Sequence, residues 1–178
     1  GLNVVCLTGG EPLTHPDFVR IITFLLSHDN IRIAVLTNGL LYNNISHALK
    51  DLDRSRVTFQ VSVDGSESTH DHLRGHGAFA RVVESISSIL SDGFGCSLSM
   101  AVNEDTAIGM RDFIKTSSRL GVRNVHFMWH FRKGQGRFVP IASAHGLMDS
   151  LGEVLDLADE FEIEIDNLEA IRRHIFTH

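Results

Sequence analysis

The chain has 178 residues, a formal net charge of −6 and 43% hydrophobic residues. This length can bury one sizeable core, so we expect a single domain over residues 1–178. The chain lacks a large basic cluster, which argues against a nucleic-acid partner. No apolar run approaches the roughly 18 residues of a membrane span, and no basic segment precedes the first apolar residues. We therefore expect no membrane segment, no secretory signal and a cytoplasmic location.

Strand-like and helix-like segments alternate along the chain. The strand-like segments are short and rich in β-branched or aromatic residues: Val4–Leu7, Ile31–Leu36, Val57–Val63, Cys96–Val102 and Val122–Trp129. Apolar residues at helical spacing lie between them, over residues 18–26, 45–52, 79–90 and 110–120. A polar loop over 130–140 then leads to an amphipathic helix with apolar positions from 147 to 161, a short strand at Glu162–Ile165 and a last helix over 168–175.

The repeated strand–helix unit predicts an α/β fold of parallel strands joined by outer helices. Such an array is either a partial (β/α) barrel or an open doubly wound sheet, and the periodicity does not separate the two. Polar or glycine-rich segments follow the five strands: Gly9-Gly10-Glu11, Thr37-Asn38-Gly39, Ser62-Val63-Asp64-Gly65, Asn103-Glu104 and Met128-Trp129-His130. Ligands gather at the carboxyl ends of parallel strands, so these segments predict a binding site.

The segment after the first strand is the most informative of these. Its glycines allow the backbone to approach a ligand closely, and the acid that follows can hold a cationic amine. Small polar groups and acids at one edge suit a ligand with an amine, a carboxylate and ribose hydroxyls. The alternative is a set of ordinary turns, because Asn-Gly and Asp-Gly are common turn dipeptides.

Read in order, these segments resemble the motifs of radical S-adenosylmethionine (radical SAM) enzymes. Gly9-Gly10-Glu11-Pro12 is similar to the family's Gly-Gly-Glu-Pro motif, and Thr37-Asn38-Gly39 to its third-strand motif. Residues 60–65 and 69–79 resemble its fourth-strand region. The His-Asp-x-x-Arg-Gly pattern over 70–75 resembles the SPASM-type branch, which includes peptide-modifying and sulfatase-maturing enzymes. The resemblance implies a partial TIM-like (β/α) barrel whose first strand is missing.

The resemblance also implies a binding site for S-adenosylmethionine. It assigns cofactor contacts to nine residues: Gly9, Gly10, Glu11, Asn38, Ser62, Asp64, Arg74, Asn103 and Met128. The first three would meet the methionyl amine, and Arg74 would bind the cofactor carboxylate with its planar guanidinium. Ser62 and Asp64 would meet the ribose or the carboxylate, and the last two would lie beside the adenine. The alternative for Arg74 is a surface salt bridge to Asp71 or Asp64.

The family's Cys-x-x-x-Cys-x-x-Cys triplet, which supplies three thiolates to a [4Fe–4S] cluster, does not occur in this chain. The two cysteines, Cys6 and Cys96, stand far apart in strand-like segments and cannot replace it. We therefore expect no metal ligands here, a cluster only in a longer parent protein, and an inactive excised core. In that parent, an oxidoreductase, the resemblance implies a 5′-deoxyadenosyl radical that takes a hydrogen atom from a peptide or protein substrate.

Two alternatives and one further expectation accompany this interpretation. His70, His72 and His76, around Asp71, could form a metal site if their loop folded back, although loop histidines are mostly solvated. The rival function is a non-catalytic, degenerate barrel that binds a ligand or a peptide. An unpaired first strand would also expose backbone groups, so we expect the isolated chain to dimerise or aggregate through this edge.

Overall fold

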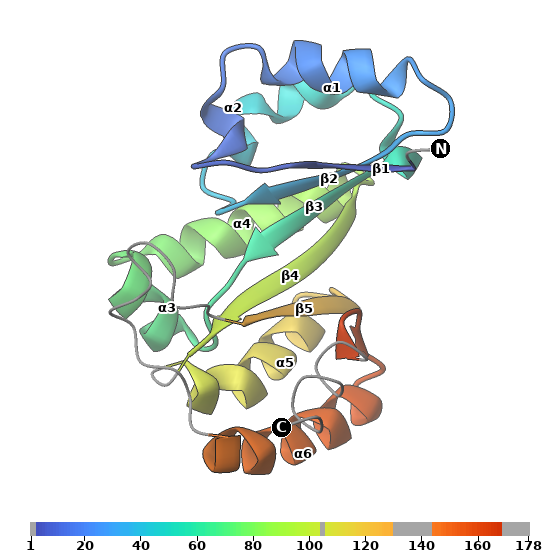
Figure 1. The fold of residues 1–178 in the computed structure, drawn as a ribbon. Coiled ribbons are helices and arrows are strands. Elements are labelled where there is room, and N and C mark those ends of the chain that lie inside the picture. The colour runs from blue at the N-terminus through green and yellow to red at the C-terminus, as the bar shows by residue number, and fades with distance from the viewer. Residues whose placement is uncertain (1–2, 104–105, 130–143, 169–178) are drawn as a thin grey trace. The chain divides into compact units, whose positions relative to one another are not determined.

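The computed structural model describes residues 3–103, 106–129 and 144–168 (Figure 1). Within these residues the strands are β1 Val4–Leu7, β2 Arg32–Thr37, β3 Val57–Ser62, β4 Gly95–Val102, β5 Asn124–Trp129 and β6 Glu164–Ile165. The α-helices are α1 Phe18–Leu26, α2 Tyr42–Ile45, α3 Glu67–Arg74, α4 Ala78–Ser91, α5 Met110–Arg119 and α6 Ala144–Glu160. Short 3₁₀ helices are η1 Pro12–Thr14, η2 Ser46–Leu49, η3 Arg54–Arg56 and η4 Ala107–Gly109.

The strands follow one another in the sheet in chain order, from β1 to β6. The pairs β1–β2, β2–β3, β4–β5 and β5–β6 are parallel. Because β1 is an edge strand, a doubly wound order with this strand in the centre is excluded. The predicted fold class is confirmed: a parallel α/β sheet in the sequential order of a partial (β/α) barrel.

The chain divides into two compact units, and the single-domain expectation stays a prediction. The first unit contains residues 1–62 and 77–97, and the second contains residues 63–76 and 98–178. In the first unit, alternate residues of β3 are buried, and Phe59 contacts Tyr42 and Phe94 edge-on, with ring centroids 5.2 and 5.4 Å apart. Period-two burial of this kind places one face of a strand against its helices.

The second unit has its own core between β4, β5 and the helices α5 and α6, which lie side by side (Figure 1). Phe113 of α5 and Phe127 of β5 are fully buried, with ring centroids 5.4 Å apart. The two helices of this pair show apolar residues at helical spacing, as the sequence predicts. Among the described helices, none is long and apolar enough to cross a membrane.

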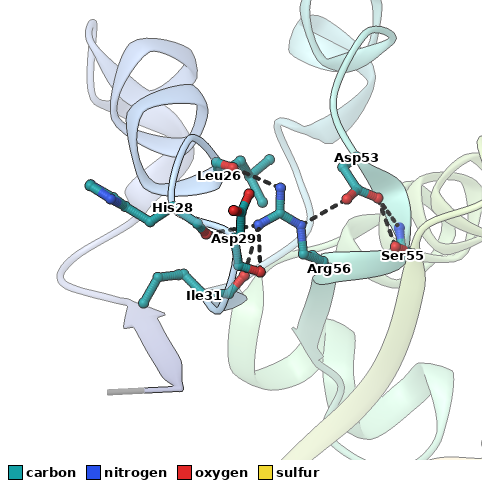
Figure 2. A network of polar contacts seen from close by, with 7 residues as sticks. All are labelled: Leu26, His28, Asp29, Ile31, Asp53, Ser55 and Arg56. Atoms are coloured by element: carbon teal, nitrogen blue, oxygen red, sulfur yellow. Dashed lines mark hydrogen bonds and ion pairs between the residues drawn. The ribbon is translucent and has the colours of Figure 1, made fainter. Parts of the chain in front are cut away.

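Arg56 holds the end of α1 against the start of β3 in the first unit (Figure 2). Its guanidinium donates to the carbonyl oxygens of Leu26 at 2.7 Å and His28 at 2.9 Å, and its Nε lies 2.7 Å from Asp53 Oδ2. Carbonyls at a helix end have no partner within the helix. The planar, multiply donating guanidinium supplies one, at the amino end of β3 and therefore away from the predicted binding site.

The predicted element boundaries differ from the structure in a few places. β5 begins at Asn124 rather than Val122, and β6 at Glu164 rather than Glu162, whose φ of 53° is a turn conformation. The helix expected over 45–52 is the short α2 followed by η2. The polar loop over 130–140 lies outside the described residues, as does nearly all of the last helix over 168–175.

The stretch around His70 was expected to be a polar loop, and this expectation is wrong. Residues 67–74 form α3, which begins with the Ser66 side chain accepting a hydrogen bond from the Thr69 nitrogen. The helix carries no apolar stripe, and its only large apolar residue, Leu73, is 48% exposed. It is attached to the protein through polar side chains instead, as the site below shows.

Candidate functional site

The turn after β1 leaves an open space beside its backbone. Gly9 has a φ of 143°, which side-chain-bearing residues rarely adopt, and a Cβ added at Gly9 or Gly10 would meet no atom within 4 Å. A cavity of about 500 Å³ adjoins this turn and is lined by residues 7–12, 14–16, 18 and 21. Its size lies within the range of small-molecule sites, about 300–1,000 Å³. The glycines are therefore not needed for internal packing, and they leave the backbone accessible to a ligand.

The Glu11 carboxylate is held in place by the turn after β2. Its Oε1 accepts a hydrogen bond from Thr37 Oγ1 at 2.7 Å, and its Oε2 accepts one from the Asn38 backbone nitrogen at 2.8 Å. Oε1 also accepts from the Leu13 nitrogen at 3.2 Å, which caps η1. A carboxylate has about four acceptor positions. Three protein donors leave one position, on Oε2, for a further cation or N–H.

The turn after β2 is stabilised by its own side chains. Asn38 Oδ1 accepts from the Leu40 nitrogen at 2.9 Å, and Thr37 Oγ1 accepts from the Gly39 nitrogen at 3.0 Å. Gly39 has a φ of 78°, and a Cβ there would lie 2.9 Å from a methyl group of Val61. Asn38 thus contacts Glu11 through its backbone, and its side chain shapes the turn.

In the second unit, Asp64 follows β3 and is buried against α3. Its carboxylate oxygen Oδ2 lies 2.5 Å from Arg74 Nε, and its backbone nitrogen donates to His70 Nδ1 at 3.1 Å. The salt bridge from Arg74 to Asp64, considered above as the alternative, is therefore present. Among the described residues, the two Nη groups of Arg74 have no partner, and its side chain is 31% exposed. The guanidinium can still bind a second carboxylate through its Nη groups.

The remaining predicted residues lie at or near the ends of their strands. Ser62 ends β3 and Met128 lies in β5, and both are half-buried. Asn103 Oδ1 accepts from the Thr106 nitrogen at 3.0 Å, so its side chain shapes the turn after β4. Glu11 belongs to the first unit, whereas Asp64 and Arg74 belong to the second. Within the first unit the structure joins Glu11 and Asn38, and within the second it joins Asp64 and Arg74.

The histidine cluster and the cysteines do not fit a metal. His70 is fully buried and faces Asp64, whereas His72 and His76 are exposed. Cys6 is an exposed residue of β1, and burial raises the pKa of the Cys96 thiol to about 12. A protonated thiol is a poor iron ligand, and two separated cysteines cannot supply three thiolates. Within the described residues, no group of three His, Cys, Asp or Glu side chains could hold a metal ion.

The family motifs assign no cofactor contact to Thr37 or His70, and His70 was named only as a candidate metal ligand. Thr37 is 3% exposed and His70 is fully buried, and each makes a hydrogen bond to a predicted site residue. The available signal was position alone: Thr37 ends a strand, and His70 lies four residues before Arg74, which is one helical turn.

Fold and site together define a parallel α/β protein with acidic and basic groups presented at the carboxyl ends of its strands. The sequence profile of the radical SAM superfamily matches residues 1–116, and the chain belongs to this superfamily. The resemblance stated from the motifs is thereby confirmed for the family.

The chain is similar in sequence to proteins of different kinds. The chain is 30% identical to a probable GTP 3′,8-cyclase of Saccharolobus solfataricus over 167 residues, which are 92% of this chain and 52% of that protein. It is 29% identical to the antilisterial bacteriocin subtilosin biosynthesis protein AlbA of Bacillus subtilis over 133 residues, 74% of this chain and 30% of that protein. The chain thus spans about half the length of the cyclase, and its match to AlbA covers 30% of that protein.

Solved structures share the fold at lower identity. A structure of anSMEcpe with bound AdoMet and the Kp18Cys peptide matches with a TM-score of 0.74 and 17% identity, over 98% of this chain and 52% of that one. SuiB of Streptococcus suis, bound to its precursor peptide SuiA, matches with a TM-score of 0.74 and 14% identity, over 92% of this chain and 37% of that one. At these identities the likeness establishes the fold.

Proposed function

We propose that this chain is the cofactor-binding core of a radical SAM oxidoreductase that acts on a peptide or protein. The observation that carries the proposal is the Glu11 carboxylate, oriented by Thr37 and Asn38 beside an open glycine turn. When bound, S-adenosylmethionine would supply the radical that abstracts hydrogen from the substrate. The chain's own residues would bind and orient the cofactor.

Glu11 would hold the methionyl amine. Its Oε2 has one acceptor position left after the hydrogen bond from Asn38, and the ammonium is a strong donor for a carboxylate. The glycine turn would allow the ligand to reach the main chain at Gly9 and Gly10. Because Glu11 is fixed by three protein donors before a ligand binds, little side-chain entropy would be lost on binding.

Arg74 would hold the cofactor carboxylate. Asp64 occupies its Nε, which fixes the plane of the guanidinium, and the two Nη groups form the end that a second carboxylate can meet. Ser62, Asn103 and Met128 remain proposed contacts at the ends of their strands. The two cysteines of this chain cannot supply the three thiolates of a [4Fe–4S] cluster.

A peptide substrate is favoured over a nucleotide by the kinds of protein that share the fold. The structures of anSMEcpe and SuiB contain bound peptides, and AlbA takes part in bacteriocin biosynthesis. The similarity to GTP 3′,8-cyclases is the observation against it. A net charge of −6 is unfavourable for an anionic substrate such as GTP. A cytoplasmic location belongs to the same proposal, because reduced thiolates persist in that compartment.

The test is a titration of the chain with S-adenosylmethionine, followed by amide signals in two-dimensional NMR, which detects weak binding. The amide signals of Gly9, Gly10 and Asn38 should show the largest changes in chemical shift. The Glu11→Gln variant, which removes the charge, should bind about tenfold more weakly. Glu84→Gln, on an exposed acid of α4, is the control and should bind as the original chain does. Absence of any shift up to millimolar cofactor would contradict the proposal.

GTP then serves as the probe of substrate class. Added to the chain in the presence of S-adenosylmethionine, it should leave the amide signals of β4 and β5 unchanged if the substrate is a peptide. Saturable shifts in these strands would show a nucleotide site and would overturn the peptide assignment, while leaving the cofactor site intact.

A further inference from the structure

Two side chains of α3 contact Asp64, which lies in the same unit as the helix. His70 and Arg74 are four residues apart, so they lie on one face of the helix, one turn from each other. His70 is 0% exposed, and Asp64 is 3% exposed. In a helix without an apolar stripe, this pair of polar contacts replaces the hydrophobic anchoring that most surface helices have.

The hydrogen bond between Asp64 and His70 fixes the charge state of the imidazole. The Asp64 backbone nitrogen donates to His70 Nδ1 at 3.1 Å, so Nδ1 carries a lone pair and the proton is on Nε2. Asp64 Oδ2 also lies 3.9 Å from Nδ1, a distance at which a charged imidazole would form an ion pair. Because Nδ1 already accepts an N–H, the imidazole is neutral and its approach to the carboxylate is not an ion pair.

Arg74 is the part of this arrangement that faces outward. Its Nε is bonded to Asp64 Oδ2 at 2.5 Å, and its side chain is 31% exposed, whereas the Asp64 side chain is only 5% exposed. The buried carboxylate therefore determines how the guanidinium is turned. The position of that carboxylate depends in turn on the main chain of Asp64, which His70 holds.

We propose that His70 is a positioning residue for Arg74: as a neutral imidazole it fixes the Asp64 main chain against α3, so that the Asp64 carboxylate presents the Arg74 Nη groups to a ligand carboxylate. This inference rests on the proposed binding of S-adenosylmethionine. It extends that proposal by naming a residue that touches no ligand and yet makes binding dependent on its protonation.

The surroundings of His70 keep it neutral. Burial lowers its pKa below the ordinary 6.5, and the positive charge of Arg74 lowers the pKa further, against the opposing effect of Asp64 and Asp71. A protonated His70 could not accept the Asp64 N–H. Its Nδ1–H would instead turn to the Asp64 carboxylate and compete with Arg74 for it. Cofactor affinity should therefore be constant at neutral pH and fall once the pH drops below the lowered pKa of His70.

Three variants separate positioning from simple structural support. In His70→Asn, Oδ1 takes the place of Nδ1 as acceptor but does not titrate. In His70→Leu, the side chain fills similar space and accepts no hydrogen bond. His72→Asn changes an exposed histidine of the same helix and is the control. The measurement is the affinity for S-adenosylmethionine by NMR titration at a series of pH values, from about pH 7 down to the lowest at which circular dichroism still shows the folded chain.

The original chain and His72→Asn should lose affinity as the pH falls below the lowered pKa of His70. His70→Asn should bind as well as the original chain at neutral pH and lose the pH dependence. His70→Leu should bind about tenfold more weakly at neutral pH. If His70→Leu binds like the original chain, or if His70→Asn keeps the pH dependence, this inference is overturned and the cofactor site stands. If the original chain binds no S-adenosylmethionine at any of these pH values, both proposals fail.

Discussion

The Glu11 carboxylate lies 2.8 Å from the backbone nitrogen of Asn38, and this hydrogen bond joins the turn after β1 to the turn after β2. Thr37, the last residue of β2, adds a second bond between the same two turns at 2.7 Å. Parallel neighbours bring the carboxyl ends of their strands together, so motifs that are 26 residues apart in the chain become one polar group. The orientation of Glu11 is therefore a property of the fold.

Replacing Thr37 by Val should destabilise the chain and loosen Glu11. Thr37 is 3% exposed, and its hydroxyl both donates to Glu11 and accepts from the Gly39 nitrogen. The loss of a hydrogen bond to a charged group and of a buried acceptor should cost about 2 kcal/mol in the free energy of unfolding. Urea denaturation measures this cost. Thr37→Ser keeps the hydroxyl and should recover most of it; equal effects of the two changes would show that the methyl group matters instead.

Gly65→Ala should destabilise the second unit through two separate effects. Gly65 has a φ of 71°, and a Cβ there would lie 3.1 Å from the Gly109 carbonyl oxygen. The left-handed conformation alone costs about 1 kcal/mol for alanine, and the contact with rigid backbone should bring the total to about 2 kcal/mol or more. The midpoint of urea unfolding provides the measurement.

Gly121→Ala is the matched control for this change. Gly121 has a φ of 74°, almost the same as that of Gly65, but a Cβ there meets nothing within 4 Å. It should therefore show the conformational cost alone. If both variants lose the same stability, the approach of Gly65 to Gly109 is relieved by small shifts and contributes nothing.

Arg56→Lys should be destabilising although it keeps the charge. The guanidinium bonds Leu26, His28 and Asp53 at once, and a single ammonium cannot reach all three (Figure 2). Because the Arg56 side chain is only 21% exposed, the free energy of unfolding should fall by about 2 kcal/mol, as measured by urea denaturation. Arg20→Lys is the control: Arg20 is exposed and lies 3.9 Å from Asp17, so no measurable change is expected. If Arg56→Lys leaves the free energy of unfolding unchanged, water replaces the lost donors.

The sequence predicted the strands well because each of them carries a dense apolar or β-branched pattern. All of β1 and most of β2 to β5 lie where the pattern places them. The motif after the first strand singled out Glu11, whereas Arg74 was singled out only by the family resemblance. α3 could not be predicted in this way. Its attachment depends on His70 and Arg74 meeting Asp64, and a polar helix held by specific hydrogen bonds leaves no periodic apolar signal. The sequence offered Asp71 and Asp64 as partners of Arg74, and the choice of Asp64 required the three-dimensional structure.

Tyr42, the single tyrosine of the chain, should remain protonated well above the ordinary tyrosine range. Its side chain is fully buried and its hydroxyl donates to Asp92 Oδ2 at 2.7 Å; burial first, and then Asp92, raise its pKa above the usual 10.0. Because the folded-state pKa exceeds the unfolded one, this group's contribution to stability is complete below about pH 10 and is lost as the pH rises above it.

Absorbance near the tyrosinate band should therefore appear only together with alkaline unfolding, followed in parallel by circular dichroism. Tyr42→Phe should abolish the absorbance change and remove the hydrogen bond to Asp92. A tyrosinate signal at about pH 10 in a chain whose circular dichroism is still that of the folded state would show that the hydroxyl reaches solvent.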